Sequence, residues 1–223
     1  MAADADSSGA GRMRLRRRFA RAALKAAGWR KVGTLPHRGV FIGAPHTSNW
    51  DFVLTILVLW SDAVSPRVLV KQEIFWWPLG PLLRALGALP TDRRGGGGLV
   101  ERLAAQARTE QSFALVLAPD GTRTRTDHWK SGFYRIAMAT GMPVTLGFID
   151  GPTRTTGVGP TVTLTGDVRA DMDVIRAFYA DKHGVRPGFG STPRLREETA
   201  DGELPAPGDT PTTDPTVDGE QPG

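Results

Sequence analysis

Residues 40–51 read VFIGAPHTSNWD, and this stretch decides the class of fold. Its first part, residues 40–44, is a short apolar run that predicts a buried β-strand. The residues that follow include Ser48 and Asn49, which are common helix N-caps, and residues 50–60 have the pattern of a helix. A buried strand that leads directly into a helix is the unit from which α/β domains are built.

The same alternation continues on the C-terminal side of this stretch. Further strands are predicted at residues 67–70, 113–118, 143–149 and 161–165, and further helices at 98–109, 132–140 and 172–183. Strands that alternate with helices in this way favour a mostly parallel sheet. We therefore expect an α/β fold in a single domain over residues 32–186, with a central sheet flanked by helices.

The N-terminal region is first polar and then strongly basic. Residues 1–11 are mostly Ala, Asp, Ser and Gly, and we expect them to be disordered. In residues 12–31, apolar side chains recur at steps of three and four among arginines, which predicts a basic amphipathic helix. Its apolar stripe consists of Leu15, Phe19, Ala22, Ala26 and Trp29. Such a helix can lie in a lipid headgroup layer or cap the core with a solvated basic face, and both interpretations stay open.

Acidic residues are concentrated at the C-terminus. Residues 187–223 are rich in Pro, Gly, Asp and Glu and have almost no large apolar residue, so we expect a disordered acidic tail. The chain has 28 basic and 23 acidic residues, and eight of the acidic ones lie in residues 197–223, which contain no Lys or Arg. The remainder carries a net charge of +13. A folded part this basic should attract phosphates, nucleic acid or an acidic lipid surface.

The residue inventory also excludes several function classes. The 223 residues contain no cysteine, which rules out disulfides, thiolate metal sites, iron–sulfur clusters and a cysteine nucleophile. The cleanest apolar run, residues 52–60, has nine residues, whereas a membrane-spanning helix needs about 20. No apolar segment of the secretory type follows the N-terminal arginines. We expect a cytoplasmic protein that does not cross a bilayer.

A histidine and an aspartate lie at the turn between the first predicted strand and its helix. Five residues of helix rotate by about 500°, so His46 and Asp51 would point about 140° apart if both lay within one helix. They can meet only if His46 sits on the turn before the helix, with Ser48 or Asn49 as the cap. Asp51 could then hold the imidazole so that Nε2 is a general base, but the pair could equally be structural.

Two further polar clusters follow apolar segments. Residues 118–125 (APDGTRTR) come after a predicted strand and combine a carboxylate, a glycine, hydroxyls and two guanidinium groups, which suits an anion. A solvated turn with surface arginines is the alternative. The other cluster places Arg93 and Arg94 before four glycines, residues 95–98. Neither Lys nor Ser or Thr follows these glycines, so they do not form the pattern of a phosphate loop.

Residues 74–83 (IFWWPLGPLL) form the most apolar and aromatic stretch of the chain. Pro and Gly interrupt it too often for a long helix. The stretch can be buried core, part of a groove for an acyl chain, or an anchor at a membrane interface, where Trp is enriched.

Together these clusters resemble the glycerolipid acyltransferases, and specifically the lysophosphatidate acyltransferase (PlsC-like) family. The family's first motif, His-x4-Asp, matches His46 to Asp51. Its second motif, a Gly followed by an apolar stretch and an Arg, is similar to residues 87–93. Its third, Pro-Glu-Gly-Thr-Arg, resembles residues 119–123, and its fourth, an apolar strand with a Pro, resembles residues 142–146.

The four motifs occur in the family's order over residues 40–150, which makes the resemblance specific. It implies an α/β domain around a mixed sheet, and acyl transfer from acyl-CoA or acyl-carrier protein to a lysophospholipid hydroxyl, most directly that of 1-acyl-glycerol-3-phosphate. His46 would be the general base, and Asp51 would orient it. The resemblance further implies that the acceptor phosphate is bound by Arg93, Arg123 and Lys71. No metal is expected, since the histidines are scattered along the chain and His46 has another use, and no cofactor is expected other than the acyl donor as co-substrate.

Two departures from the family pattern affect these expectations. Asp120 stands where the family has Glu, so its carboxylate is one methylene shorter. With Gly121 and Thr122, it is expected to support the motif or the developing oxyanion. The family's N-terminal pair of membrane-inserting helices is not found, and the basic helix and the segment around Trp76 and Trp77 are candidates to replace it. We therefore expect peripheral association with the inner face of the membrane.

Alternative functions are also compatible with the sequence. The chain could act on another lipid acceptor, or it could be a non-catalytic membrane-lipid-binding protein of the same fold. Nucleic-acid binding would rest on the basic N-terminus alone, and an apolar stripe that contains Phe19 and Trp29 is better suited to lipid. The expected partners are a lysophospholipid acceptor, an acyl-CoA or acyl-carrier-protein donor and an anionic membrane surface, and no nucleic acid.

Overall fold

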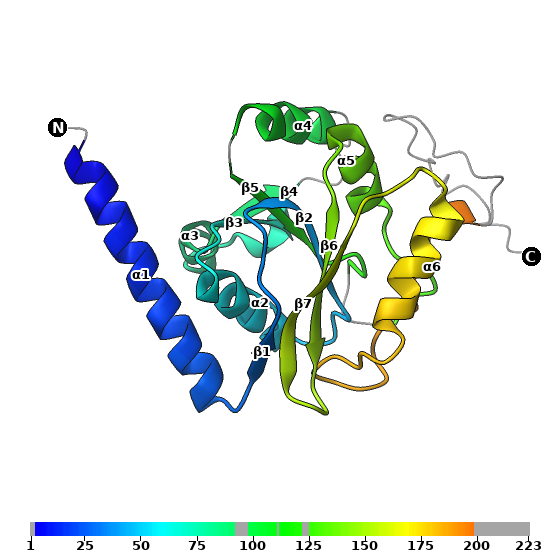
Figure 1. The fold of residues 1–223 in the computed structure, drawn as a ribbon, viewed down its shortest axis with the longest axis horizontal. Coiled ribbons are helices and arrows are strands. Elements are labelled where there is room, and N and C mark those ends of the chain that lie inside the picture. Colours follow the sequence, from blue (N-terminus) through cyan, green and yellow to red (C-terminus); the bar gives the residue numbers. More distant parts are fainter. Residues whose placement is uncertain (1–2, 92–97, 111, 122–124, 199–223) are drawn as a thin grey trace, which may run out of the picture.

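The computed structural model describes residues 3–91, 98–110, 112–121 and 125–198 (Figure 1). Seven strands form one sheet in the order β1-β7-β6-β2-β5-β3-β4. The strands are β1 (Arg30–Val32), β2 (Arg38–Ala44), β3 (Pro66–Lys71), β4 (Ala88–Thr91), β5 (Phe113–Leu117), β6 (Val144–Asp150) and β7 (Thr155–Val162). All neighbouring strands are parallel except β6 and β7, which are antiparallel. The expected mostly parallel mixed sheet is confirmed.

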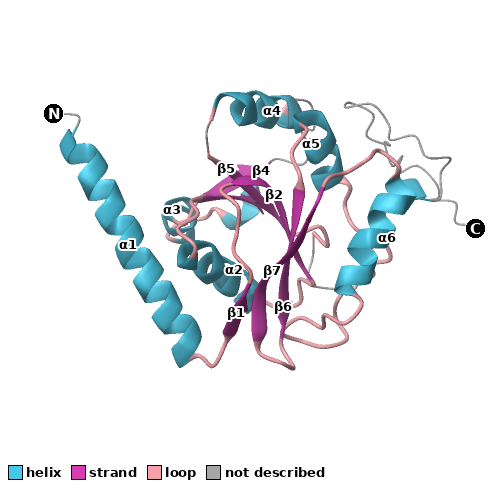
Figure 2. Cartoon of the chain, viewed as in Figure 1, coloured by secondary structure: helices cyan, strands magenta, loops and turns pink. Residues whose placement is uncertain are grey.

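Helices cover both faces of this sheet (Figure 2). They are α1 (Ala3–Ala26), α2 (Asn49–Ser61), α3 (Leu79–Ala85), α4 (Leu99–Thr109), α5 (Gly132–Thr140) and α6 (Val168–Tyr179), with short 3-10 helices η1 (Gln72–Ile74) and η2 (Arg196–Glu198). Apolar residues of α4, α5 and α6 form one core cluster with the sheet, and those of α2 form a second cluster. Helix α1 packs on the outside of α2.

The central strand β2 contributes to both of these cores. Val40 and Ile42 belong to the cluster under α4, α5 and α6, whereas Phe41 belongs to the cluster under α2. Successive side chains of a strand point to opposite faces, and here both faces are covered. This explains why residues 40–44 read as an uninterrupted apolar run and not as an alternating one.

Several elements differ from the expected bounds. Helix α1 runs from Ala3 to Ala26, so it includes most of the segment expected to be disordered, and Arg30 and Lys31 lie in β1, not in a helix. Gly28 has a φ of 71°, a left-handed conformation that ends the helical path. Strand β7 and helix α6 both lie on the N-terminal side of their predicted positions. The sequence did not predict β1, β4 or α3.

Residues 187–198 were expected to be disordered, and the structure contradicts this expectation. Leu195 is fully buried, and the backbone carbonyl of Arg194 accepts a hydrogen bond of 2.7 Å from the backbone N–H of Trp129. Arg176 of α6 forms a 3.0 Å ion pair with Glu198. The packed unit therefore extends past residue 186. Residues 199–223 lie outside the described part of the chain.

Candidate active site

The two polar turns singled out in the sequence meet at one edge of the sheet. Strands β2 and β5 are parallel neighbours, with Val40 beside Leu115 and Ile42 beside Leu117. Both strands therefore end at the same edge, and the chain leaves each of them into a polar turn. The carboxyl ends of neighbouring parallel strands are the usual place for a site in an open α/β sheet.

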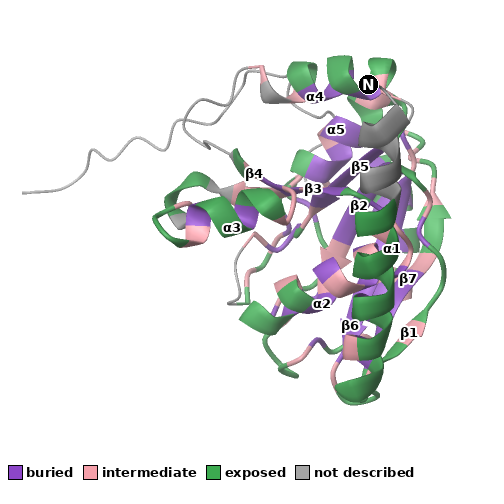
Figure 3. Cartoon of the chain, turned by 90° about the vertical axis from the view of Figure 1, so that its left-hand side faces the viewer, coloured by how far each residue is buried: buried purple, intermediate pink, exposed green. Residues whose placement is uncertain are grey.

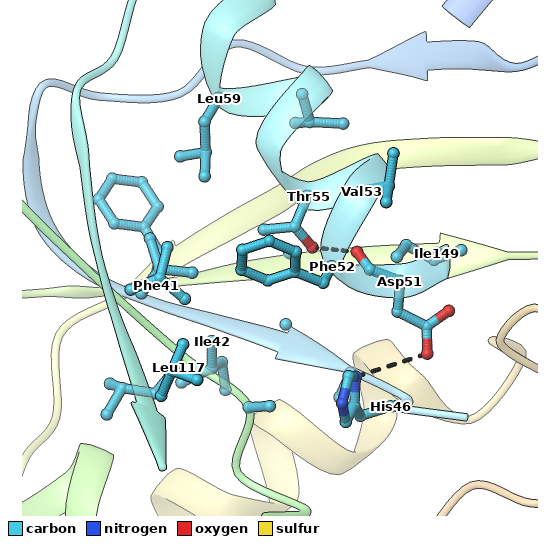
Figure 4. Close-up of a pocket in the computed structure, with 18 of the residues that line it drawn as sticks. Phe41, Ile42, His46, Asp51, Phe52, Val53, Thr55, Leu59, Leu117 and Ile149 are labelled. Atoms are coloured by element: carbon cyan, nitrogen blue, oxygen red, sulfur yellow. Dashed lines mark hydrogen bonds and ion pairs between the residues drawn. The ribbon is translucent and has the colours of Figure 1, made fainter. Parts of the chain in front are cut away.

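The first turn carries His46 and leads into α2. Ser48 is the N-cap of this helix, and it forms a capping box with Asp51. Asp51 Oδ2 accepts hydrogen bonds from the backbone N–H groups of Thr47 at 2.5 Å and Ser48 at 2.6 Å. Because His46 lies before the helix, its Nδ1 comes to 3.5 Å from the same oxygen, which is ion-pair distance (Figure 4). The expected geometry of the turn is confirmed.

This arrangement can support proton transfer. Asp51 is buried, whereas the His46 side chain keeps 20% of its surface exposed. A carboxylate beside Nδ1 favours the tautomer with the proton on that nitrogen, which leaves Nε2 able to accept a proton. The negative charge also stabilises the imidazolium that forms when Nε2 does so.

Asp120, on the second turn, supports the first turn directly. Its Oδ2 accepts a hydrogen bond of 2.7 Å from the backbone N–H of His46. The shorter side chain therefore still reaches the histidine turn. The amide N–H of Gly121 donates to the carbonyl of Ala118 at 3.1 Å, so this group shapes its own turn and does not present a donor to an oxyanion.

The other predicted site residues lie beyond what the structure describes. Arg93, Thr122 and Arg123 are outside the described residues. Lys71 is the last residue of β3, and its side chain is not among those that the structure describes. Their roles remain predictions. Among the described residues, no group of three or more His, Cys, Asp or Glu side chains could hold a metal ion.

A cavity of about 850 Å³ opens beside His46. It extends between α2 and the sheet, and its walls are mostly apolar, with polar groups such as His46, Asn49 and Thr55 among them. Figure 4 shows His46 and Asp51 at one side of it and Phe41 and Leu59 toward the other side. Its size lies within the usual range of about 300–1,000 Å³ for small-molecule sites. The site thus combines a polar reacting end with a long apolar compartment.

The segment at residues 74–83 contributes to this cavity and also to the surface. Leu79, Leu82 and Leu83 line the cavity. Trp76 and Trp77 are 61% and 82% exposed. One part of the stretch therefore lines the cavity, and another part is exposed on the surface.

Sequence reasoning missed residues that reach the site from distant parts of the chain. Val158 of β7 and Leu35, which precedes β2, line the cavity. Trp129 and Ser191 lie close enough to Asp120 to lower its pKa. None of these residues has a local pattern that marks it. Only the sheet order and the packing of residues 187–198 bring them to the site.

Burial dominates the titration of Asp120. With all its surroundings taken together, the pKa of this carboxyl is raised from 3.8 to about 6, and burial is the largest cause. The hydrogen bond from the His46 amide and the nearby Trp129 and Ser191 side chains lower the pKa by less, and the charge of Asp51 adds to the rise.

Asp120 should therefore make the stability of the protein depend on pH. The folded protein, with a pKa of about 6 at this carboxyl, binds more protons than the unfolded chain with a pKa of 3.8. The contribution of Asp120 to the free energy of unfolding is therefore complete below about pH 4 and is lost as the pH rises through 6. The shift corresponds to about 3 kcal/mol at most. Asp120→Asn should remove this component, as measured by urea unfolding at several pH values.

Asp127→Asn provides the matched control, because Asp127 is an exposed carboxylate on the same loop. This variant should keep the wild-type dependence on pH. A wild-type slope in Asp120→Asn would contradict the assigned cause.

Comparisons with known proteins agree with this fold and these motifs. Residues 30–145, just over half of the chain, match the family model described as Acyltransferase. A 1-acyl-sn-glycerol-3-phosphate acyltransferase from Cocos nucifera is 30% identical over 113 residues, which cover 48% of this chain and 35% of that protein. The enzyme of the same name from Limnanthes douglasii is 26% identical over 113 residues, with 48% and 39% covered. The match thus spans well under half the length of these relatives.

A solved structure extends the comparison beyond the matched residues. The crystal structure of the 1-acyl-sn-glycerophosphate (LPA) acyltransferase PlsC from Thermotoga maritima superposes with a TM-score of 0.55 and 15% identity. The superposition covers 79% of this chain and 81% of that one, which shows a shared fold. On the family match and this shared fold, the chain belongs to the acyltransferase family.

Proposed function

We propose that this chain is a lipid O-acyltransferase. It transfers a fatty acyl group from acyl-CoA or acyl-carrier protein to the free hydroxyl of a lysophospholipid, with 1-acyl-glycerol-3-phosphate as the acceptor and phosphatidate as the product. The observation that carries the proposal is the His46–Asp51 pair, 3.5 Å apart, at the end of an apolar cavity of about 850 Å³.

The proposed reaction is a direct transfer without an acyl-enzyme. His46 Nε2 accepts the proton of the acceptor hydroxyl as the hydroxyl oxygen attacks the thioester carbon. The carbon–sulfur bond then breaks, and the thiol leaves with the proton that His46 returns. Asp51 keeps the ring oriented and stabilises its positive charge. The donor thioester supplies the driving force, and the step as written needs no metal or cofactor.

The two ends of the site suit the two ends of the substrate. The apolar cavity, lined by residues such as Phe52 and Leu59, receives an acyl chain. Arg93, Arg123 and Lys71 bind the acceptor phosphate in this proposal, because guanidinium and ammonium groups pair well with phosphate oxygens. Gly121 shapes the turn after Asp120 through its hydrogen bond to the carbonyl of Ala118, and Thr122 is assigned a supporting role in the motif.

An acceptor panel tests the proposed substrate. The purified chain is incubated with acyl-CoA and lysolipids of different headgroups, and the released thiol and the lipid products are measured. Lysophosphatidate should give the highest kcat/KM, and Arg123→Ala should raise the KM for this acceptor more than for a neutral monoacylglycerol. Equal use of both acceptors would reject phosphate recognition. Vesicle binding without thiol release for any acceptor would support the non-catalytic alternative.

The membrane part of the proposal rests first on α1. This helix has two apolar faces: Ala20 and Leu24 are buried against the protein, while Leu15 and Phe19 are 70% and 59% exposed. The described part of the helix is exposed over most of its surface in Figure 3. At about 100° per residue, and within residues 11–26, whose side chains are described, one arc beside the exposed stripe carries only basic side chains. These are Arg14, Arg17, Arg18, Arg21 and Lys25.

The second part of the membrane surface is the mouth of the cavity. Val53 and Leu82 line the cavity and are also 42% and 55% exposed. Trp50, at the start of α2, is 67% exposed. Exposed apolar side chains around an apolar opening favour entry of a lipid from a bilayer, and Trp is suited to the interface. We place the chain peripherally on the inner, cytoplasmic face of the membrane, with its basic arc on anionic lipids.

Loss of the exposed stripe should weaken binding to membranes. Leu15→Ser combined with Phe19→Ser removes two apolar side chains, each worth about 1.5–3 kcal/mol when buried. Partitioning onto phosphatidylglycerol vesicles should fall about tenfold or more, as measured by sedimentation. The matched control is Met138→Ser with Val174→Ser, which removes two exposed apolar residues from α5 and α6 on the other face of the sheet. An equal loss in both double variants would contradict a specific role for α1.

A further inference from the structure

Residues 184–191, here called the strap, follow α6 and lie against the turn that carries His46. The strap begins at a fixed point on the sheet: Gly184 forms a parallel bridge with Asp150 at the end of β6. Its N–H donates to Ile149 at 3.1 Å, and its carbonyl accepts from Gly151 at 2.8 Å. The chain after the strap is held by buried Leu195. The strap is therefore anchored on both sides.

The strap contacts the residues on either side of His46. The backbone N–H of Arg186 donates a hydrogen bond of 3.0 Å to Thr47 Oγ1. Gly190 lies so close to Pro45 that a Cβ at Gly190 would be 2.8 Å from Pro45 Cβ. Pro45 and Thr47 are both buried, so neither can move away from the strap into solvent.

The C-terminal end of the strap also reaches the second polar turn. Ser191 is buried, and its Oγ accepts a hydrogen bond of 2.9 Å from the backbone N–H of Thr126. Ser191 is also close enough to Asp120 to influence its titration, and Asp120 in turn holds the His46 N–H. The strap thus supports the histidine turn from two directions.

We propose that the strap is a positioning element of the active site, which fixes the backbone of His46 by holding Pro45 and Thr47. The inference rests on the proposed function, because it assigns these residues a role in aligning the general base. The strap lies outside residues 30–145, the region that matches the acyltransferase family model. The strap would therefore support the catalytic histidine from a part of the chain that carries no family motif.

Gly190→Ala is the sharpest variant of the strap. Gly190 does not have the left-handed backbone conformation of Gly184 or Gly188, so alanine adds no backbone strain there. The new methyl group would press directly on Pro45, the neighbour of His46. The matched control is Gly132→Ala in α5, which also lacks a left-handed backbone and where a Cβ meets no atom within 4 Å.

The expected result is a selective loss of turnover. A shift of His46 by a fraction of an ångström should lower kcat about tenfold or more, since a misplacement of about 1 Å can cost about 10²-fold. The KM for the acyl donor should change by no more than about twofold, because Gly190 does not line the cavity. Wild-type kcat in a folded Gly190→Ala variant would overturn the proposal. An equal loss in Gly132→Ala would also overturn it.

A second pair of variants tests the same proposal if Gly190→Ala does not fold. Thr47→Val has nearly the same shape as threonine but cannot accept the Arg186 N–H, so kcat should fall several-fold. Thr47→Ser keeps the hydroxyl and should recover most of that loss. If the valine and serine variants have the same kcat, the hydrogen bond to the strap does not position His46.

A spectroscopic measurement separates this proposal from the proposed function. The ring resonances of His46, assigned by their loss in His46→Ala, report the surroundings of the imidazole even in a protein with no turnover. They should shift in Gly190→Ala and stay in place in Gly132→Ala. Unshifted resonances in Gly190→Ala would reject the strap. Absent thioester turnover in the wild-type protein, with shifted resonances in the variant, would reject only the proposed function.

Discussion

Replacing His46 by alanine is expected to lower thioester turnover by about 10²- to 10⁴-fold, because the variant has no group that can accept the proton of the attacking hydroxyl. The fold should be retained, since the His46 ring lies at the edge of the cavity and not in either core cluster. Release of free thiol from acyl-CoA, measured at saturating acceptor, gives the rate, and thermal unfolding gives the stability.

His37→Ala is the control for this variant. His37 is exposed and precedes β2, so its loss should leave turnover unchanged. The binding of a non-hydrolysable acyl-CoA analogue should also survive in His46→Ala, because the apolar cavity remains. A His46→Ala variant with more than about a tenth of wild-type turnover would contradict general-base catalysis by this residue.

Asp51→Asn is expected to have the second largest effect. The amide oxygen of asparagine can still accept the backbone N–H groups of Thr47 and Ser48, so the helix cap is kept. The negative charge beside His46 Nδ1 is lost, and with it the stabilisation of the imidazolium. Turnover should fall by about 10²-fold or more, while the free energy of unfolding should change by less than about 1 kcal/mol.

Comparison with Asp51→Ala separates catalysis from capping. The alanine variant loses both the charge and the hydrogen bonds that Asp51 contributes to the capping box, while Ser48 remains the N-cap, so it should be destabilised by about 1 kcal/mol more than the asparagine variant. Both variants should have similarly low turnover. If Asp51→Asn kept wild-type turnover and only Asp51→Ala lost activity, the carboxylate would serve the helix cap alone.

The central part of the fold could be predicted from sequence because local patterns determine it. Strands β2, β5 and β6 are short apolar runs buried on both faces, and α5 begins and ends at the predicted residues. The His46 turn was also predictable, since rotation along a helix allows the pair to meet only with His46 before the cap. These features depend on neighbours within about ten residues of sequence.

Other features depend on contacts between distant segments. Residues 187–198 have the composition of a disordered tail, yet Leu195 and the Arg176–Glu198 ion pair anchor them to α6 and its surroundings. In α1, the helical period identified the stripe of Leu15 and Phe19, which is exposed, while the face that packs on α2 contains Ala20 and Leu24. Small residues such as Ala20 carry little weight in a hydrophobic pattern, although they permit close helix packing.

The most direct test of the account is the fate of a labelled acyl group. Wild-type protein is incubated with acyl-CoA labelled in the fatty acid, lysophosphatidate and anionic vesicles, and the lipids are separated by mass spectrometry. The account predicts that label appears in phosphatidate as thiol is released, and that both signals disappear together in His46→Ala. Label found in free fatty acid with none in phosphatidate, or phosphatidate formed equally well without His46, would contradict it.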